Sequence, residues 1–424
     1  MKRYSEYKDS GVKWIGEIPK HWKIKTLRAF IRLYSEKNHA DKQLLSVTRE
    51  QGVISRNVES KEENHNYIPD DLSGYKLVRE GDFAINKMKS WQGSYGVSNY
   101  EGIVSPAYYV CKLEIGNKDF FSKAIRSKAY VPFFNQYSKG IRVDQWDLSP
   151  IALKSIPFFE PPLSEQTEIV SYLDSKVAKI DRYISTAKKK IAALDELKQV
   201  TIADAVTHGI NANAKMKDSG IKWIGMVPEH WNSRFLSQIA NEQNLSNKGM
   251  INNNLLSLSY GRVIRKSIES TNGLLPFSFE TYQIINNGNI ILRFTDLQND
   301  HKSLRVGLVT ENGIITSAYT CIAPKKFVLS NYLYFLLHSA DIKKVFYGMG
   351  GGLRQNLNYT EFRKLRLMIP PLSEQNSIAS YIDHKVAQIE KMKAAELSQI
   401  EKLKEYKQRL ISDVVTGKVK VTND

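Results

Sequence analysis

The segment KDSGVKWIGEIPKHW, from Lys8 to Trp22, returns almost unchanged as KDSGIKWIGMVPEHW, from Lys217 to Trp231. Each copy combines an Asp-Ser-Gly turn, two tryptophans and a proline, and neither follows the period of a helix or of a strand. An irregular segment that occurs twice, 209 positions apart, indicates a framework part that is needed at two corresponding places. We therefore interpret the chain as an internal duplication.

The duplication extends beyond this segment. The sequence PPLSEQ occurs at Pro161–Gln166 and again at Pro370–Gln375, and SYLDSKVAKID at Ser171–Asp181 matches SYIDHKVAQIE at Ser380–Glu390. Between these anchors the likeness is weaker, as in GYKLVREGDFAI against TYQIINNGNIIL. A similar framework with divergent content indicates two halves that share one scaffold and display different surfaces.

Composition places the chain among globular proteins. It has 424 residues, of which 42% are hydrophobic and 25% charged, enough for two or more domains with cores of their own. No apolar run approaches the roughly 20 residues of a membrane span, and the N-terminus lacks the apolar region of a secretory signal. Cys111 and Cys321 lie in apolar, strand-like runs, which favours buried thiols in a reducing cytoplasm over a redox or metal role.

The charge points to a polyanionic partner. The formal net charge is +17, and basic residues outnumber acidic ones on both sides of Gly209. Because both halves are basic, the excess is not a tail added to a neutral protein, and nucleic acid is the first candidate partner. The alternative is a surface whose charge serves solubility alone. An acidic mimic of DNA is excluded.

Each half is predicted to begin with a mixed segment and to end in a long helix. The mixed segments have short strands rich in Val, Ile, Tyr and Phe, turns with Gly, Asn and Asp, and helices at Phe120–Ser138 and Ser330–Phe346. PPLSEQ is a helix start signal, in which Ser164 or Ser373 can cap the first turn. Val-Thr-(His)-Gly closes each helix.

The long helices carry a coiled-coil pattern. In the first copy no Gly or Pro interrupts the run to about residue 207, and apolar residues recur every seven positions at Leu173, Ile180, Ala187 and Leu194. The second copy has such a seam from Ile382, with polar interruptions at Lys393 and Glu396. A helix about 65 Å long, at about 1.5 Å per residue, needs a partner, and its own duplicate is the obvious one.

The predicted fold class is therefore α+β. Two similar domains of mixed strands and helices are joined by two long antiparallel coiled-coil helices with pseudo-two-fold symmetry. The predicted boundaries are 1–155 for the first domain, 156–210 for the central helix, 211–369 for the second domain and 370–424 for the C-terminal helix.

The sequence does not indicate an enzyme of its own. It contains no G-x-x-x-x-G-K-[ST] loop, and the glycine-rich Gly348–Arg354 does not open a helix after a strand. EPPL at Glu160 is interpreted as a helix start and not as a methyltransferase loop. The histidines form no metal-binding pair, and His21 and His230 belong to the repeated framework segment. We expect no catalytic residues, no metal and no cofactor.

Basic loops interleaved with aromatic and amide residues occur at matching places in both halves. Arg can bind guanine, Gln and Asn can bind adenine, and Lys neutralises phosphate, although a single exposed basic residue usually contacts water. The residues predicted to contact DNA are Arg49, Arg56, Lys87, Lys89, Trp91, Gln92, Ser94, Lys139, Arg142 and Gln145 in the first half, and Tyr260, Arg262, Arg265, Arg293, Gln298, Lys302, Arg354, Gln355 and Asn358 in the second.

Taken together, the repeated fifteen residues, the two PPLSEQ helix starts and the EGDFAI and NGNIIL strands resemble the specificity subunit of type I restriction-modification systems. The resemblance spans nearly the whole chain. It implies that each domain is a target recognition domain that reads one half of a split, asymmetric sequence in double-stranded DNA. It also implies that the paired helices space the domains and dock two methyltransferase subunits, which two restriction subunits join.

Two other classes remain open at this point. One is a duplicated DNA-binding regulator without enzyme partners, which would bind DNA tightly by itself. The other is an enzyme with an unrecognised site, which incubation with S-adenosylmethionine and mixed DNA would expose.

Overall fold

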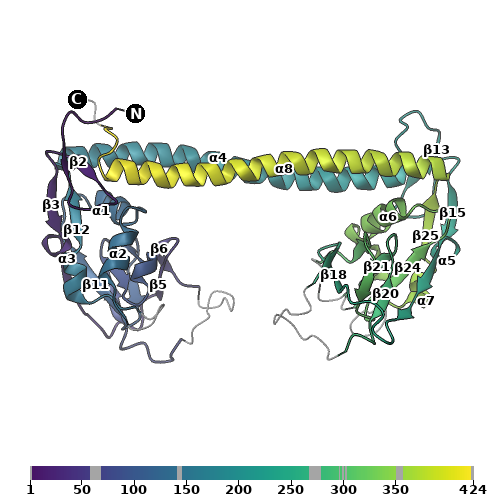
Figure 1. The fold of residues 1–424 in the computed structure, drawn as a ribbon, viewed down its shortest axis with the longest axis horizontal. Coiled ribbons are helices and arrows are strands. Elements are labelled where there is room, and N and C mark those ends of the chain that lie inside the picture. Colours follow the sequence, from purple (N-terminus) through teal and green to yellow (C-terminus); the bar gives the residue numbers. More distant parts are fainter. Residues whose placement is uncertain are drawn as a thin grey trace. The chain divides into compact units, whose positions relative to one another are not determined.

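The computed structural model describes residues 2–57, 68–140, 146–266, 278–295, 297, 300, 303–349 and 357–421. The chain divides into two compact units, Met1–Ala187 with Leu397–Asp424, and Lys188–Glu396. Each unit has its own hydrophobic core and combines mixed strands and short helices with parts of the two long helices α4 and α8 (Figure 1). The fold class is α+β, as predicted.

The first unit is built on a four-stranded antiparallel sheet with the strand order β4-β11-β8-β9. Three further strand pairs, β1-β2, β3-β12 and β5-β6, and the pair β7-β10 complete its sheets. The strands are β1 Tyr7–Asp9, β2 Glu17–Pro19, β3 Lys23–Thr26, β4 Ile31–Tyr34, β5 Leu45–Thr48, β6 Gly52–Ser55, β7 Lys76–Val78, β8 Phe83–Asn86, β9 Tyr95–Val97, β10 Gly102–Val104, β11 Tyr108–Leu113 and β12 Pro157–Glu160. The short helices are η1 Leu27–Ala29, η2 Ser90–Gln92, α1 Lys118–Ile125, α2 Val131–Tyr137 and α3 Pro150–Ser155.

The second unit repeats this plan with one added strand, because a three-stranded sheet β17-β20-β23 stands where the first unit has the pair β7-β10. Its four-stranded antiparallel sheet has the order β16-β24-β21-β22, and β13-β14, β15-β25 and β18-β19 correspond to three pairs of the first unit. Its strands are β13 Met216–Asp218, β14 Met226–Pro228, β15 Asn232–Phe235, β16 Ala240–Gln243, β17 Leu245–Ser246, β18 Leu256–Ser259, β19 Arg262–Arg265, β20 Gln283–Ile285, β21 Ile290–Leu292, β22 Val306–Leu308, β23 Gly313–Ile315, β24 Thr320–Pro324 and β25 Arg366–Ile369. Its short helices are α5 Leu236–Ile239, α6 Ser330–Ile342, η3 Val345–Gly348 and α7 Tyr359–Phe362.

The central strands are apolar on both faces because both faces are covered. In β8, Phe83 and Ile85 point into the larger core, whereas Ala84 packs on the opposite face with Val110. The alternation follows from the two-residue period of a strand. The same division recurs in the second unit, where the two faces of β21 enter two different clusters. Cys111 and Cys321 are both buried and free, as the apolar runs around them predicted.

The long helices are α4, Leu163–His208, and α8, Leu372–Val415. Both begin one residue before the serine that was predicted to cap them, so Ser164 and Ser373 lie inside the first turn. The prolines explain this start. The carbonyl of Pro162 accepts the Gln166 amide at 2.9 Å, and the side-chain amide of Gln166 donates to the carbonyl of Pro161 at 2.9 Å.

The predicted coiled-coil seam is buried. Leu173, Ile180, Ala187 and Leu194 each expose less than a tenth of their surface. Where polar residues interrupt the seam of α8, they form ion pairs with α4. In the second unit, Glu396 lies 2.5 Å from Lys190, Glu390 lies 2.7 Å from Lys198, and Lys393 pairs with Asp195. In the second unit the residue numbers of these pairs rise along α4 as they fall along α8, so the helices are antiparallel there.

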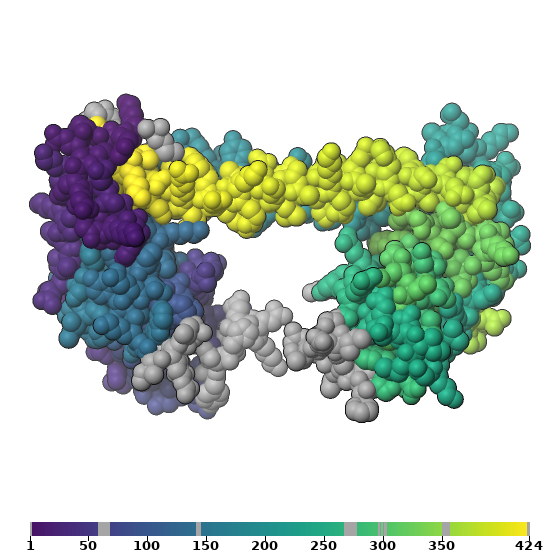
Figure 2. Space-filling view, viewed as in Figure 1, coloured from purple at the N-terminus to yellow at the C-terminus, as the bar shows by residue number. Residues whose placement is uncertain are grey.

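The repeated fifteen residues, here called the clamp segments, bind the ends of both long helices. In the first unit, Trp22 Nε1 donates to Glu165 Oε1 at 3.1 Å, and His21 Nε2 lies 2.8 Å from Glu165 Oε2. Glu165 is the glutamate of the first PPLSEQ, in the first turn of α4. The end of α8 meets the same segment, where Gly417 packs on Pro19 and Trp22. In the space-filling view the N-terminal residues (purple) lie against this end of α8 (yellow) (Figure 2).

The second clamp segment makes the same contacts in its own unit. Trp231 Nε1 donates to Glu374 Oε1 at 3.1 Å, and His230 Nε2 lies 2.7 Å from Glu374 Oε2. Gly209, at the end of α4, is in the left-handed conformation, with φ +76°, and packs on Trp231. The predicted framework role of the two histidines is therefore confirmed. Each clamp segment joins the start of one long helix to the end of the other.

The helix predicted over Phe120–Ser138 is wrong as a single element. The structure has α1 and α2 with a break between them, because Pro132 lacks the amide that a continuous helix would need there. Arg126, the first residue after α1, turns its side chain toward neighbouring loops. The helix predicted over Ser330–Phe346 ends earlier, at Ile342, where Lys344 adopts a left-handed conformation with φ +58°.

Candidate nucleic-acid interface

In the first unit, two of the predicted loops lie side by side. They are the turn between β5 and β6, which carries Arg49, and the loop between β8 and β9, which carries Gln92. Both line a concave pocket of about 580 Å³ together with Arg126 and Lys128. Arg49 is exposed and lies 3.5 Å from Glu50. The fold therefore brings cationic and amide side chains together at one surface pocket.

A third basic loop of this unit was predicted at Tyr137–Trp146, and the residues at its end contact the β8–β9 loop. Lys87 Nζ donates to Asp147 Oδ2 at 3.0 Å, and this bond raises the pKa of Lys87. The rings of Trp91 and Trp146 lie 5.3 Å apart. Lys139 is exposed and exchanges backbone hydrogen bonds with Asp147. The two loops are thus held together by an ion pair and an aromatic contact, and the backbone bonds between Lys139 and Asp147 join the two ends of the second loop.

The remaining predicted residues of this unit differ in exposure. Lys89 is exposed and Arg56 is half-buried. Ser94 exposes only 4% of its surface, so it offers little to a ligand in this conformation. Arg142 and Gln145 lie outside the described residues.

In the second unit, the β18–β19 hairpin presents an aromatic ring to solvent. Its two-residue turn is Tyr260–Gly261, and both residues have positive φ, as the tight turns of two-residue hairpins require. Tyr260 exposes 81% of its surface. Arg262 is exposed beside it. Arg265 is already engaged, because its guanidinium contacts both carboxylate oxygens of Glu311 at 2.5–2.9 Å.

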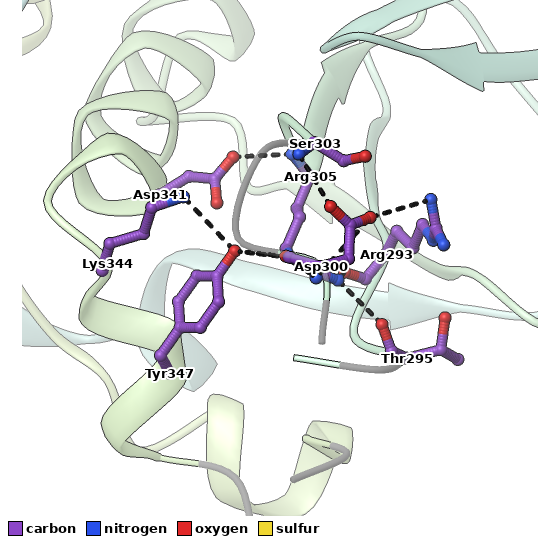
Figure 3. A network of polar contacts seen from close by, with 8 residues as sticks. All are labelled: Arg293, Thr295, Asp300, Ser303, Arg305, Asp341, Lys344 and Tyr347. Atoms are coloured by element: carbon purple, nitrogen blue, oxygen red, sulfur yellow. Dashed lines mark hydrogen bonds and ion pairs between the residues drawn. The ribbon is translucent and has the colours of Figure 1, made fainter. Parts of the chain in front are cut away.

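The side chain of Arg305 is fully buried and donates hydrogen bonds to backbone carbonyls of described residues in the loop between β21 and β22. Arg305 Nη1 donates to the carbonyls of Arg293 at 3.2 Å and of Thr295 at 2.8 Å, and Nη2 donates to the carbonyl of Asp300 at 2.6 Å. Its Nε donates to the hydroxyl of Tyr347 at 3.1 Å. Figure 3 shows these groups converging on one guanidinium. Arg293, a predicted DNA contact, also lies 3.6 Å from the Asp300 carboxylate.

Asp341, on α6, lies at the buried base of this loop, whereas His338 Nε2, one turn earlier on α6, lies 3.3 Å from Gln199 Oε1 of α4. Asp341 Oδ2 accepts the backbone amide of Arg305 at 2.6 Å. Burial raises the pKa of Asp341 from 3.8 to about 6, although its contacts with Arg305 and Lys344 oppose the shift. Burial also lowers the pKa of His338 from 6.5 to about 4, with a smaller contribution from Lys198.

The last predicted loop of the second unit lies largely outside the described residues. Arg354, Gln355 and most of the glycine-rich stretch belong there, as do Gln298 and Lys302 of the β21–β22 loop. Asn358 is described, and its side chain caps α7 by accepting the Glu361 amide at 2.9 Å. That bond gives Asn358 a structural role in this conformation.

Reasoning from the sequence missed two arginines that hold these loops. Arg126 donates to four carbonyl oxygens, those of Arg49, Glu50, Gly93 and Tyr95, at 2.8–2.9 Å. Burial lowers the pKa of Arg126. A basic residue at a helix C-terminus normally complements the helix dipole. The position of Arg126 therefore gave no reason to expect that it binds loop carbonyls. Arg305 had a signal, since it stands at the start of an apolar strand.

The described part of the chain lacks two features that would indicate other functions. Within the described ranges, no three or more His, Cys, Asp or Glu side chains come together as metal ligands. Among the described helices, none combines the length and apolarity that a membrane crossing needs.

Comparison with known proteins gives a consistent set of similarities. Residues 228–402 match the family model described as the type I restriction modification DNA specificity domain. One relative is a protein of Methanocaldococcus jannaschii that carries the name putative type I restriction enzyme MjaX specificity subunit. It is 23% identical over 429 residues, which cover 96% of each chain.

Two solved structures share the fold over nearly the full length. One comes from a study of the complex assembly and conformational transition of the type I R-M system. It has a TM-score of 0.66 at 12% identity, and the match covers 95% of this chain and 99% of the other. The other is the HsdS subunit from Thermoanaerobacter tengcongensis, with a TM-score of 0.52 at 13% identity, covering 95% and 98%.

Proposed function

Because the chain belongs to the specificity subunits of type I restriction-modification systems, we propose that it reads a split, asymmetric target in double-stranded DNA, one half with each domain. The duplication is the observation that carries this proposal. Two units repeat one strand order, yet their loops between corresponding strands differ in sequence, length and internal contacts. A protein that read two identical half-sites would have no use for two different sets of loops.

The ends of each recognition domain support its independence. The strands β3 and β12 pair so that Lys23 faces Glu160, and β15 and β25 pair so that Asn232 faces Ile369. Each domain therefore begins and ends on one ribbon next to the long helices. We assign recognition to residues 1–155 and 211–369 and spacing to 156–210 and 370–424, with β12 preceding the helix inside the first spacer range.

The chain acts as the recognising subunit and not as a catalyst. Specificity subunits act with methyltransferase and restriction subunits on DNA, and the chemistry resides in those partners. We propose two methyltransferase subunits, one for each copy of the clamp and helix framework, joined by two restriction subunits. A stand-alone regulator is not favoured, since the relatives are restriction-enzyme subunits. The free, buried thiols support a cytoplasmic location.

DNA binding draws on the basic surface and on the predicted loop residues. The net charge of +17 attracts the phosphate backbone without regard to sequence. Arg49 in the first unit, and Tyr260 and Arg262 in the second, are exposed and can meet a groove, and Gln92 is half-buried beside Arg49 at the same pocket. Lys89 and Lys139 are suited to phosphate. We propose these as contacts, together with the predicted residues outside the described ranges.

Methylation-sensitive sequencing tests this function in cells that hold the chain and its partner subunits. We expect methylation at one split motif with unequal halves and a fixed gap, and loss of that methylation when the gene for this chain is deleted. Methylation that persists without the chain would contradict the proposal. A second arm uses the purified chain alone, which should show no methyl transfer or cleavage.

A further inference from the structure

We propose that Arg126 and Arg305 are positioning residues for DNA recognition, each holding the backbone of the reading loops in its own unit without touching a base. The proposal rests on the proposed function and adds a role for two residues that were not among the predicted DNA contacts. It predicts that each arginine controls the discrimination of one half-site and leaves the other half-site unaffected.

Arg126 ties two separate loops into one surface. Its Nη1 donates to the carbonyls of Gly93 and Tyr95, in the β8–β9 loop and at the start of β9, and its Nη2 to those of Arg49 and Glu50, in the β5–β6 turn. The planar guanidinium presents its donors in a fixed fork, so four acceptors fix the position of one loop against the other. Gln92 and Arg49, two predicted readers, are thereby held at a set separation.

Arg305 reaches the same result within one loop. Its donors meet carbonyls near the start of the β21–β22 loop, at Arg293 and Thr295, and another farther along, at Asp300. Tyr347 braces this arrangement, because its hydroxyl accepts from Arg305 Nε at 3.1 Å and donates to the Asp300 carbonyl at 3.0 Å. One buried side chain therefore holds three described residues of this loop, Arg293, Thr295 and Asp300 (Figure 3).

The geometry argues against direct reading by either arginine. The Arg305 side chain is fully buried, and Nε, Nη1 and Nη2 are all engaged in hydrogen bonds. Both Nη atoms of Arg126 are engaged with carbonyls. A contact with a base or phosphate would have to release these carbonyl oxygens, and each one that is buried and left unsatisfied costs about 1–3 kcal/mol. The role that remains is to hold the loops.

The experiment uses the full complex of the chain with its methyltransferase subunits and a DNA library in which both half-sites are randomised. Arg126→Met and Arg126→Lys should lower discrimination at the first half-site by about tenfold or more, because lost carbonyl partners release the loops. Discrimination at the second half-site should be unchanged. Arg305→Met and Arg305→Lys should give the reverse pattern.

Lysine should not rescue either site, because one ammonium cannot replace a fork that joins separated carbonyls. The exposed Arg28 and Arg234, one in each unit, provide matched controls. Arg28→Met and Arg234→Met should leave both half-sites unchanged. Each variant also contains its own control, since the untouched domain reports whether the chain is folded and assembled.

Tyr347→Phe tests the second unit without removing the buried charge. It deletes the hydroxyl that braces Arg305 and should lower discrimination at the second half-site severalfold, with the salt dependence of binding unchanged. A smaller salt slope would mean that a phosphate contact was lost.

The proposal is overturned if the variants weaken both half-sites equally, if lysine restores full discrimination, or if only thermal stability changes. A parent complex that read no split target would instead defeat the proposed function, so the two failures are distinguishable.

Discussion

The two units hold their framework in the same way and hold the loops proposed to read DNA in different ways. At the clamp, the pairs Trp22 with Glu165 and Trp231 with Glu374 have the same hydrogen bond at 3.1 Å. At the loops, Arg126 comes from the end of α1 and bridges two loops, whereas Arg305 stands at the start of β22 and braces one. The two copies share the contacts that fix the scaffold and differ in those that shape the proposed reading surface.

The clamp tryptophans should give the largest effect. Both are fully buried between the ends of the two long helices. Trp22→Ala and Trp231→Ala should each lower the free energy of unfolding of their own unit by about 3–5 kcal/mol, through the cavity left behind. Hydrogen exchange resolved by region would measure both. The two clamp segments are not equivalent if one substitution lowers the free energy of unfolding of its unit strongly and the other hardly changes it.

The clamp glutamates sharpen the comparison because their surroundings are not identical. Glu165 and Glu374 both accept from a tryptophan and lie beside a histidine, but Glu165 also accepts from the hydroxyl of Tyr4. Glu165→Gln and Glu374→Gln should each cost about 1–3 kcal/mol, with the larger loss at Glu165. Equilibrium unfolding in denaturant measures the difference, and the Tyr4→Phe background should reduce it. A larger loss at Glu374 would contradict this reading of the contacts.

A smaller effect concerns pH and applies to the second unit. Between about pH 4 and pH 6, native Asp341 keeps a proton that the unfolded chain releases, because burial raises its pKa from 3.8 to about 6. This contribution to stability is therefore lost as pH rises. Native His338 lacks a proton that the unfolded chain binds, because burial lowers its pKa from 6.5 to about 4. Its contribution is lost as pH falls, so the two residues offset each other.

Removing either residue should uncover the other. In Asp341→Asn the unfolding free energy of the second unit should rise by about 1–2 kcal/mol from pH 4 to pH 6.5, and in His338→Asn it should fall over a similar range. Denaturant unfolding at a series of pH values measures both slopes. Parallel pH profiles in the two variants would show that these groups do not titrate as the structure indicates.

The framework was predictable from the sequence, and the internal support of the loops was not. Repeats at a constant offset identified the clamp segments, and seven-residue spacing identified the buried seam from Leu173 to Leu194. The role of Arg126 was not predicted, because its four acceptors are backbone carbonyls, and no pattern of side chains in the sequence indicates where these lie in the fold. The cap at Ser164 failed because two prolines start the helix earlier. Local signals predict elements, whereas contacts between loops depend on the folded backbone.

The exchange of one domain tests the central claim most directly, because the claim is that scaffold and reading surface are separable. The natural cut points are Asn232 and Ile369, which face each other across β15 and β25. Residues 232–369 would be replaced by the matching segment of a relative, and methylation sites would be mapped in cells with the partner subunits. We predict that one half of the methylated motif changes while the other half and the gap persist. A change in both halves together would contradict the account.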